Sequence, residues 1–134
     1  SQKNKLSQNK QAGARKKPER VEGTLSCELP KTLVKKNDIH ITSKRNFDCF
    51  QDTELDMLLK RTLNVKNIII CGVNTDTCVY GTTFGASNRG YNPIVIECCT
   101  GSMRGEDQHK TALKIMSQSI AWVMKKEEIL NKLN

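Results

Sequence analysis

Apolar runs and stretches with helical spacing alternate along the chain from about residue 38 onward. The runs Ile68–Cys71 and Pro93–Cys98 are almost wholly apolar, which is typical of strands that are buried on both faces of a sheet. Alternating apolar and polar residues at Asp38–Ser43 predict a further short strand, and Trp122–Met124 predicts a last one.

Helices are expected between and after these strands. In Thr53–Leu63, four leucines recur at a spacing that places them on one helical face. A helix of small residues runs from Thr77 to Gly90, and Asp107–Ala121 and Lys126–Leu133 are the two remaining predicted helices. The apolar face of Asp107–Ala121 is expected to consist of Leu113, Ile115, Met116 and Ile120.

The order of these elements predicts the fold class. Strands that alternate with helices form a mostly parallel sheet with helices on both faces, which is a three-layer α/β/α arrangement. Ligands of such sheets bind beyond the carboxyl ends of the strands. Lys44 and Cys78 each follow a predicted strand closely, so both are expected on the same rim of the sheet.

The positive charge is concentrated at the N-terminus. Residues 1–36 carry ten Lys and Arg against three Asp and Glu, whereas the rest of the chain carries twelve against eleven. Residues 1–20 contain almost no apolar side chains, so we expect a basic, flexible tail ahead of a single domain in residues 21–134. The cluster Arg15–Lys17 could contact a polyphosphate or a nucleic acid, but no aromatic residue stands beside it to stack on a base, so a nucleic-acid partner is not expected.

The six cysteines and two histidines do not have the spacing of a metal site. No CxxC pair occurs, and only His40 and His109 could add imidazole ligands, so neither a metal nor another cofactor is expected. Free thiols are typical of a reducing cytoplasm, although a redox switch at the vicinal pair Cys98–Cys99 is an alternative. No apolar run approaches the roughly 20 residues that cross a membrane. We expect His109 on a helix surface and Trp122 in the core or at a subunit interface.

The segment that joins the Ile68–Cys71 strand to the next helix is the main candidate for chemistry. Gly72–Asp76 consists of turn-forming and helix-capping residue types, and Cys78 follows at the mouth of the helix. The positive end of a helix dipole favours a thiolate, and the unpaired backbone N–H groups there could hold an oxyanion. Lys44 could supply an ammonium beside that thiol. The alternatives are a small packing residue at Cys78 and an ordinary surface lysine at Lys44.

Two motifs connect these positions to a known family. The segment GVNTDTCVYGTTFGASNRGY resembles the nucleophile motif of the isochorismatase-like cysteine hydrolases, in which G-V-x-T-x-x-C precedes a helix of small residues. The segment KRNFDCFQDTELDMLL resembles the lysine segment of the same family, and GTLSCELP resembles the approach to it. The likeness extends over Gly23–Leu130, with the motifs in the expected order.

The resemblance implies a role for each matching residue. Cys78 resembles the nucleophile that forms a thioester with the substrate carbonyl carbon, and Lys44 resembles the lysine of the catalytic triad. The Val73–Asn74 peptide resembles the family's cis bond, which would place the Asn74 and Cys78 N–H groups as an oxyanion hole. Presence of the cysteine implies the branch that hydrolyses small amides or ureido compounds. The substrate-binding residues implied are Phe50, Asn74 and Thr75.

The sequence also departs from the family pattern. The triad aspartate, expected in a V-x-D-x-Q setting after the first strand, has no counterpart before Lys44, and the available carboxylates suit loops or helix caps. We therefore expect that the N-terminal strands of the domain are missing and that the lysine strand is separated from the cysteine strand. This predicts a weakly active or inactive chain, or alternatively a non-catalytic pseudoenzyme or subunit of a hydrolase oligomer. A homo-oligomer is the expected assembly. The carboxylates that could be considered for the missing triad aspartate are Asp38, Asp48, Asp52 and Asp76.

Overall fold

The structure is a computed structural model that describes residue 25 and residues 28–133. The chain divides into two compact units between residues 39 and 40. The predicted tail at residues 1–20 and half of the GTLSCELP segment lie outside the described residues. In the first unit, described residues form short turns, in which the Leu33 N–H donates to the Pro30 carbonyl and the Lys35 N–H donates to the Asp38 carboxylate, both over 2.8 Å.

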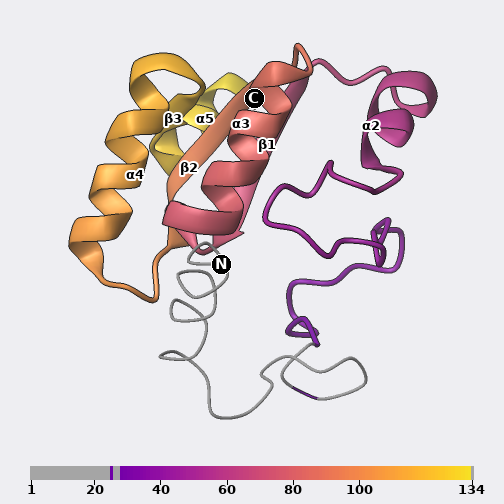
Figure 1. Cartoon of the computed structure of the whole chain (residues 1–134), viewed down its shortest axis with the longest axis horizontal. Helices are drawn as coiled ribbons and strands as arrows, with labels where there is room; N and C mark the ends of the chain where they lie inside the picture. Colours follow the sequence, from indigo (N-terminus) through magenta and orange to yellow (C-terminus); the bar gives the residue numbers. More distant parts are fainter. Residues whose placement is uncertain (1–24, 26–27, 134) are drawn as a thin grey trace, which may run out of the picture. The chain divides into compact units, whose positions relative to one another are not determined.

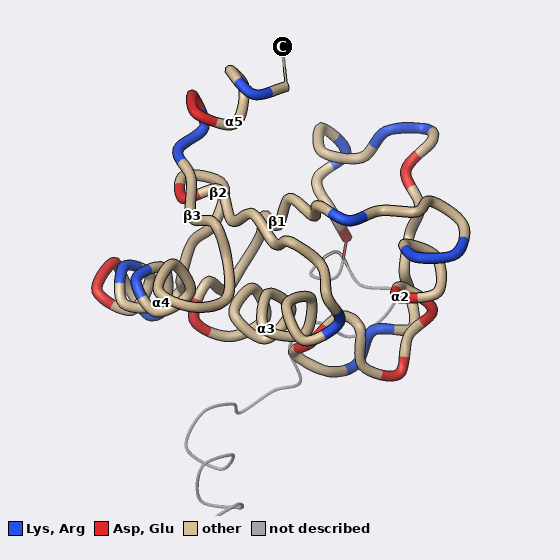
Figure 2. The backbone as a smooth tube through the Cα atoms, turned by 90° about the horizontal axis from the view of Figure 1, so that it is seen from above, with Lys and Arg blue, Asp and Glu red and all other residues tan. Residues whose placement is uncertain are grey.

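The second unit is built around a parallel sheet of three strands in the order β1-β2-β3 (Figure 1). Helices α3 and α4 lie on one side of this sheet and α5 on the other, as the view in Figure 2 shows. The predicted α/β class with a parallel sheet between helical layers is therefore confirmed. The strands are β1 (Asn67–Val73), β2 (Asn92–Gly101) and β3 (Trp122–Met124), and the helical segments are α2 (Leu55–Met57), η2 (Leu58–Thr62), η3 (Thr75–Val79), α3 (Tyr80–Asn88), α4 (Glu106–Ser119) and α5 (Lys126–Leu133). η2 and η3 are single π-helical turns.

The hydrophobic core lies between the sheet and the α3–α4 layer. Ile70 of β1 and Val95 of β2 are direct register partners, and both are buried against this layer. Met116 of α4 is fully buried beside them. Since parallel strands are hydrogen-bonded along their lengths and covered by helices, this is the part of the molecule with the most regular support.

The buried stripe of α4 differs from the one expected. Its buried residues follow the spacing i, i+3, i+4, i+7, which is the spacing of one helical face. His109 is the first member of that stripe and is buried, so its predicted surface position is wrong. Ile115 lies off the stripe and is 44% exposed, so its predicted core position is also wrong. The prediction relied on residue type, whereas the position of a residue around the helix axis decides whether it is buried. The stripe consists of His109, Ala112, Leu113 and Met116.

β1 is buried on one face only, whereas its apolar sequence predicts burial on both. Ile69 is 46% exposed and Val73 is 59% exposed, and Cys71 is exposed between them. The cause is the position of β1 at an edge of the sheet, with α5 packed instead against β2. Within the residues that the structure describes, the outer face of β1 thus remains accessible.

The segment Asp38–Ser43 contains no strand, so this prediction is wrong. Alternating residues make a strand only when a neighbour completes the hydrogen-bond ladder, and the sheet of the second unit ends at β1. Side chains bond to this stretch in place of a ladder: Arg45 Nη1 donates to the Thr42 carbonyl over 2.8 Å, and the Ser43 hydroxyl donates to the Glu54 carboxylate. Lys44 therefore follows an irregular segment. The expected separation of a lysine strand from the cysteine strand stays a prediction, because no strand precedes Lys44.

Trp122 occupies the first position of β3, at the other edge of the sheet. Its side chain is 70% exposed, so a place in the core is wrong. The alternative of a subunit interface stays a prediction. Both edges of the sheet consequently present apolar side chains at the surface of this unit.

Candidate active site

Cys78 is positioned by an abrupt change from strand to helix. β1 ends at Val73, the Val73–Asn74 peptide is cis as the resemblance implies, and η3 begins at Thr75. The Asn74 carbonyl accepts hydrogen bonds from the N–H groups of Thr77 and Val79, each 3.1 Å long. Cys78 lies in this first turn and is half-buried. The thiol thus stands at the carboxyl end of β1, where ligands of parallel sheets bind.

One face of α3, the helix that follows Cys78, contacts the segment KRNFDCFQDTELDMLL, residues 44–59, which we call the Lys44 segment. Gly81 and Thr82 come one turn after Cys78 on that face. A Cβ atom on Gly81 would meet the backbone of Phe47 and Asp48 at 3.4 Å, so the segment passes directly over the glycine. The Thr82 hydroxyl accepts a hydrogen bond from the Cys49 N–H (3.2 Å). The same hydroxyl donates to the Phe47 carbonyl (3.3 Å), and this single side chain secures two backbone groups of the segment.

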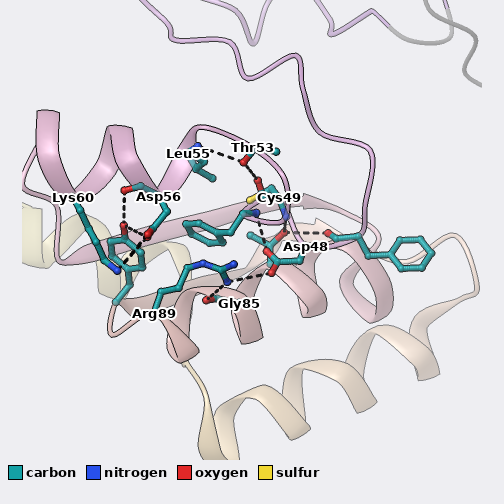
Figure 3. Close-up of polar contacts among 12 residues, drawn as sticks. Asp48, Cys49, Thr53, Leu55, Asp56, Lys60, Gly85 and Arg89 are labelled. Atoms are coloured by element: carbon teal, nitrogen blue, oxygen red, sulfur yellow. Dashed lines mark hydrogen bonds and ion pairs between the residues drawn. The ribbon is translucent and has the colours of Figure 1, made fainter.

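Further along the same face, Asp48 is held by charge and by a hydrogen bond (Figure 3). Arg89 Nη1 lies 3.3 Å from Asp48 Oδ2 and also donates to the Gly85 carbonyl over 3.0 Å. The Phe50 N–H donates to Asp48 Oδ1 over 2.8 Å. A Cβ atom on Gly85 would collide with the Asp48 carboxylate, so only glycine leaves room for it. The carboxylate that the sequence assigns to a loop therefore anchors the Lys44 segment to α3.

Two stacked aromatic rings, with a cation over each, continue the contacts of Asp48 toward α2 and η2. Phe50 stacks on Tyr91 with ring centroids 5.6 Å apart, Arg89 lies 5.0 Å from the Phe50 ring, and Lys60 lies 5.2 Å from the Tyr91 ring. The Tyr91 hydroxyl donates to Asp56 Oδ1 over 2.8 Å. Burial, followed by this acceptor, raises the pKa of Tyr91 to about 12, and the bond from Tyr91 lowers the pKa of Asp56.

Phe50 is 5% exposed and belongs to the core. Its contacts with Tyr91 and Arg89 give it an anchoring role, and its contact with a substrate stays a prediction. Phe47 is the exposed aromatic side chain of the same segment, at 67%. Sequence spacing alone did not distinguish the two rings.

Lys44 is exposed, and its charge acts on the thiol of Cys49. Burial raises the pKa of Cys49, while the Thr82 hydroxyl and the Lys44 ammonium oppose this rise. Cys49 contacts Thr82, which lies one helical turn from Cys78. The Lys44 segment therefore contacts α3 about one helical turn after Cys78, without a strand beneath Lys44.

The loop between β2 and α4 is bonded to Asn74 and Asp76, which lie close to Cys78 in the chain. Ser102 Oγ donates to Asp76 Oδ1 over 2.6 Å, and Arg104 Nη1 lies 2.7 Å from Asp76 Oδ2. The bond from Ser102, followed by burial and by Arg104, leaves the pKa of Asp76 lowered overall. The Met103 N–H donates to the Asn74 side-chain oxygen over 2.9 Å. Asp76 is thus a paired anion, and the helix cap assigned to it is wrong because Asn74 holds the N-cap position.

Thr75 fastens η3 to α4. Its side chain is fully buried, and a hydrogen bond of 2.8 Å joins Thr75 Oγ1 to His109 Nδ1. The substrate contact predicted for Thr75 stays a prediction. His109 and Arg104 were missed as supports of the site by the sequence analysis. The position of His109 in the apolar stripe of α4 is the signal that could have revealed it.

No group of three or more His, Cys, Asp or Glu side chains in the described part of the chain is arranged to hold a metal ion. Among the described helices, none is both long and apolar enough to cross a membrane.

Comparisons with known proteins agree with the motifs. The Isochorismatase domain model matches residues 2–128. An uncharacterized isochorismatase family protein of Escherichia coli O157:H7, YecD, is 33% identical over 97 residues, which cover 72% of this chain and 50% of YecD. The chain spans about half the length of the curated relatives it matches.

Solved structures show the same likeness. An isochorismatase-like hydrolase from Alkaliphilus metalliredigens superposes with a TM-score of 0.80 at 26% identity, covering 87% of this chain and 63% of that one. The nicotinamidase of Staphylococcus aureus has a TM-score of 0.57 at 36% identity, covering 60% of this chain and 49% of the nicotinamidase.

Proposed function

The chain belongs to the isochorismatase family, and we propose that it is the cysteine-bearing part of a hydrolase that cleaves an amide or ureido C–N bond of a small molecule. The observation that carries the proposal is the position of Cys78, in the first helical turn beyond β1 and on the helical face that holds the Lys44 segment. Likeness to a nicotinamidase supports the amide class of substrate.

In the proposed reaction, the Cys78 sulfur attacks the carbonyl carbon of the substrate. The backbone N–H groups of Asn74 and Cys78 stabilise the negative oxygen of the tetrahedral intermediate. The C–N bond then breaks, the nitrogen leaves with the proton of the thiol, and a thioester remains on Cys78. Water hydrolyses the thioester to a carboxylic acid and restores the thiol. Lys44 stabilises the negative charge that develops during both steps.

The thiol proton needs an acceptor, and the nearby described carboxylates are already occupied. Asp76 is paired with Arg104, and Asp48 is paired with Arg89. General-base catalysis contributes roughly 10²–10⁴-fold to such reactions. The proposal therefore includes low turnover by the 134-residue chain alone.

The test is ammonia release from nicotinamide and from N-carbamoyl amino acids by the purified chain, with intact mass measured during the reaction. The expected result is slow turnover with an acyl adduct on Cys78, both absent in Cys78→Ala. Cys98→Ser is the matched control, because it removes one thiol from β2 and none from η3. Turnover that survives in Cys78→Ala would overturn the proposed nucleophile, and fast turnover by the wild-type chain would overturn the need for a further base.

The open outer face of β1 supports a second candidate, a non-catalytic subunit of a hydrolase oligomer. Exposed Ile69 and Val73 at a sheet edge are features that a neighbouring chain could cover. Sedimentation equilibrium and labelling of Cys78 with a thiol probe separate the two candidates. A stable homo-oligomer whose Cys78 never reacts favours the subunit, whereas a reactive Cys78 favours the hydrolase.

A further inference from the structure

The pairing of β1 with β2 is interrupted by a large bulge. Ile70 pairs with Val95, and the next register pair is Gly72 with Thr100. β1 advances two residues between these pairs, while β2 advances five. Bulges of this kind redirect side chains and are common beside functional sites. In the chain, the bulge comes just before the segments that lead from β1 to η3 and from β2 to α4.

Three of the cysteines gather at this bulge. Cys71 directly precedes Gly72 and Cys99 directly precedes Thr100, so each cysteine lies next to a member of the first register pair after the bulge. After partial burial, the neighbouring Cys99 thiol is the group that most raises the pKa of Cys71, so these two thiols lie close together. Cys98 Sγ lies 4.0 Å from Cys99 Sγ. All three residues are exposed, in contrast to the half-buried Cys78.

We propose that Cys71 and Cys99 form an oxidation site, in which a peroxide converts the two thiols into a disulfide that links β1 to β2. Neighbouring strands of a sheet lie about 4.7–4.9 Å apart, which is within the range of about 4.4–6.8 Å over which disulfides join Cα atoms. Cys98 is the competing partner of Cys99, but consecutive Cα atoms are only about 3.8 Å apart, which is shorter than the usual Cα separation in a disulfide. This spacing favours the pair on two strands.

The chemistry needs only the two thiols and the peroxide. The Cys99 sulfur, as a thiolate, attacks one peroxide oxygen, the O–O bond breaks, and the departing hydroxide takes up a proton to leave as water. The sulfenic acid formed on Cys99 is then attacked by the Cys71 sulfur, the S–O bond breaks, and a second water leaves with the Cys71 proton. The two thiols are oxidised by two electrons, and the peroxide is reduced to two waters.

The assignment of the first step to Cys99 rests on the surroundings of Cys71. Partial burial, followed by the neighbouring Cys99 and Cys98 thiols, raises the pKa of Cys71. A raised pKa makes a thiol a poorer first nucleophile, which suits Cys71 to the second, resolving step.

Such a disulfide would tie together the strands that support the proposed active site. The segment after β1 and the loop after β2 exchange the hydrogen bonds of Asn74 with Met103 and of Asp76 with Ser102. Cys71 and Cys99 lie directly before these segments in the chain. The link would close a loop that contains η3 and Cys78, without consuming the Cys78 thiol.

The test is treatment of the reduced full chain with hydrogen peroxide, followed by intact mass and tryptic mapping without reduction. Trypsin leaves Cys71 and Cys78 on the peptide Asn67–Arg89, and Cys98 and Cys99 on Gly90–Arg104. The expected result is a monomer that has lost two hydrogen atoms, with these two peptides cross-linked and dithiothreitol restoring the original mass. Each of the two peptides carries two thiols, so the mass of the cross-linked pair does not identify the bonded cysteines. Four Cys→Ser variants identify them.

The cross-link is expected to persist in Cys78→Ser and Cys98→Ser and to disappear in Cys71→Ser and Cys99→Ser. Circular dichroism of the reduced variants, with Cys71→Ala and Cys99→Ala as second substitutions, verifies that each is folded. A link that survives in Cys71→Ser, a disulfide confined to Gly90–Arg104, a disulfide-linked dimer, or addition of oxygen without cross-linking would each overturn the proposal. None of these outcomes depends on hydrolase activity, so this proposal and the proposed function can fail separately.

Discussion

The two sides of the proposed site are supported in different ways. Cys78 follows β1, whose backbone is hydrogen-bonded to β2, and its turn is tied to the β2–α4 loop through Asn74 and Asp76. The Lys44 segment has no ladder. Three contacts hold it: the ion pair of Asp48 with Arg89, the hydrogen bond from the Cys49 N–H to the Thr82 hydroxyl, and the stacking of Phe50 on Tyr91. Regular backbone pairing distributes support over many groups, whereas side-chain anchoring concentrates it in a few. Single substitutions should therefore affect the lysine side more.

The largest effect on this comparison is expected from Phe50→Ala. The Phe50 ring is 5% exposed and stacks on Tyr91, so its loss leaves a cavity and should lower the free energy of unfolding by about 3–5 kcal/mol. Phe47→Ala is the matched control. It removes the same kind of ring, but Phe47 lies three residues earlier in the chain and is 67% exposed. Its effect should stay within about 0.5 kcal/mol. Urea denaturation measures both, and equal losses would show that the segment is not anchored through Phe50.

A smaller effect is expected from Gly85→Ala. The new Cβ atom would collide with the Asp48 carboxylate and force it away from Arg89, at a cost of about 1–3 kcal/mol in the free energy of unfolding.

Gly81→Ala provides the control on the same helical face, because its Cβ atom would meet neighbours at 3.4 Å or more. There the better helix propensity of alanine, up to about 1 kcal/mol, offsets the tight contact. A Gly85→Ala protein as stable as Gly81→Ala would show that Asp48 moves aside without cost.

The smallest effect is expected on the cysteine side, from Asp76→Asn. Ser102 and Arg104 lower the pKa of Asp76 in the folded chain, so the carboxylate stabilises the fold above its unfolded pKa of about 3.9 and loses that contribution as pH falls through the lower folded value. Because Arg104 is 63% exposed, we expect at most about 1 kcal/mol.

Unfolding free energies measured from pH 7 down to pH 3 test this, since the wild-type chain should lose more stability than Asp76→Asn over that range. Asp52→Asn, in the same unit but without a cation partner among the described ion pairs, serves as the control. Identical pH profiles for the wild-type chain and Asp76→Asn would show that the ion pair contributes nothing in solution.

Local pattern was sufficient for the elements whose partners lie nearby in the chain. β2, β3, α4 and α5 occur close to where apolar runs and helical spacing predict them. Pattern failed where burial depends on phase or on a partner. His109 is polar yet completes a buried stripe, and Ile69 is apolar yet faces outward from an edge strand. The strand expected at Asp38–Ser43 is absent, and this segment does not pair with β1, where the sheet of the second unit ends.

The sequence by itself determined the family, the position of Cys78 at the start of a helix, and the alternation of strands and helices, because motif spacing and apolar periodicity are local properties of the chain. Only the tertiary structure decided that Asp48 pairs with Arg89, that Asp76 pairs with Arg104, and that Thr75 meets His109. Only the register of β1 with β2 brought Cys71 beside Cys99. Contacts between residues 28 to 41 positions apart depend on how helices and strands pack, and no local pattern encodes that packing.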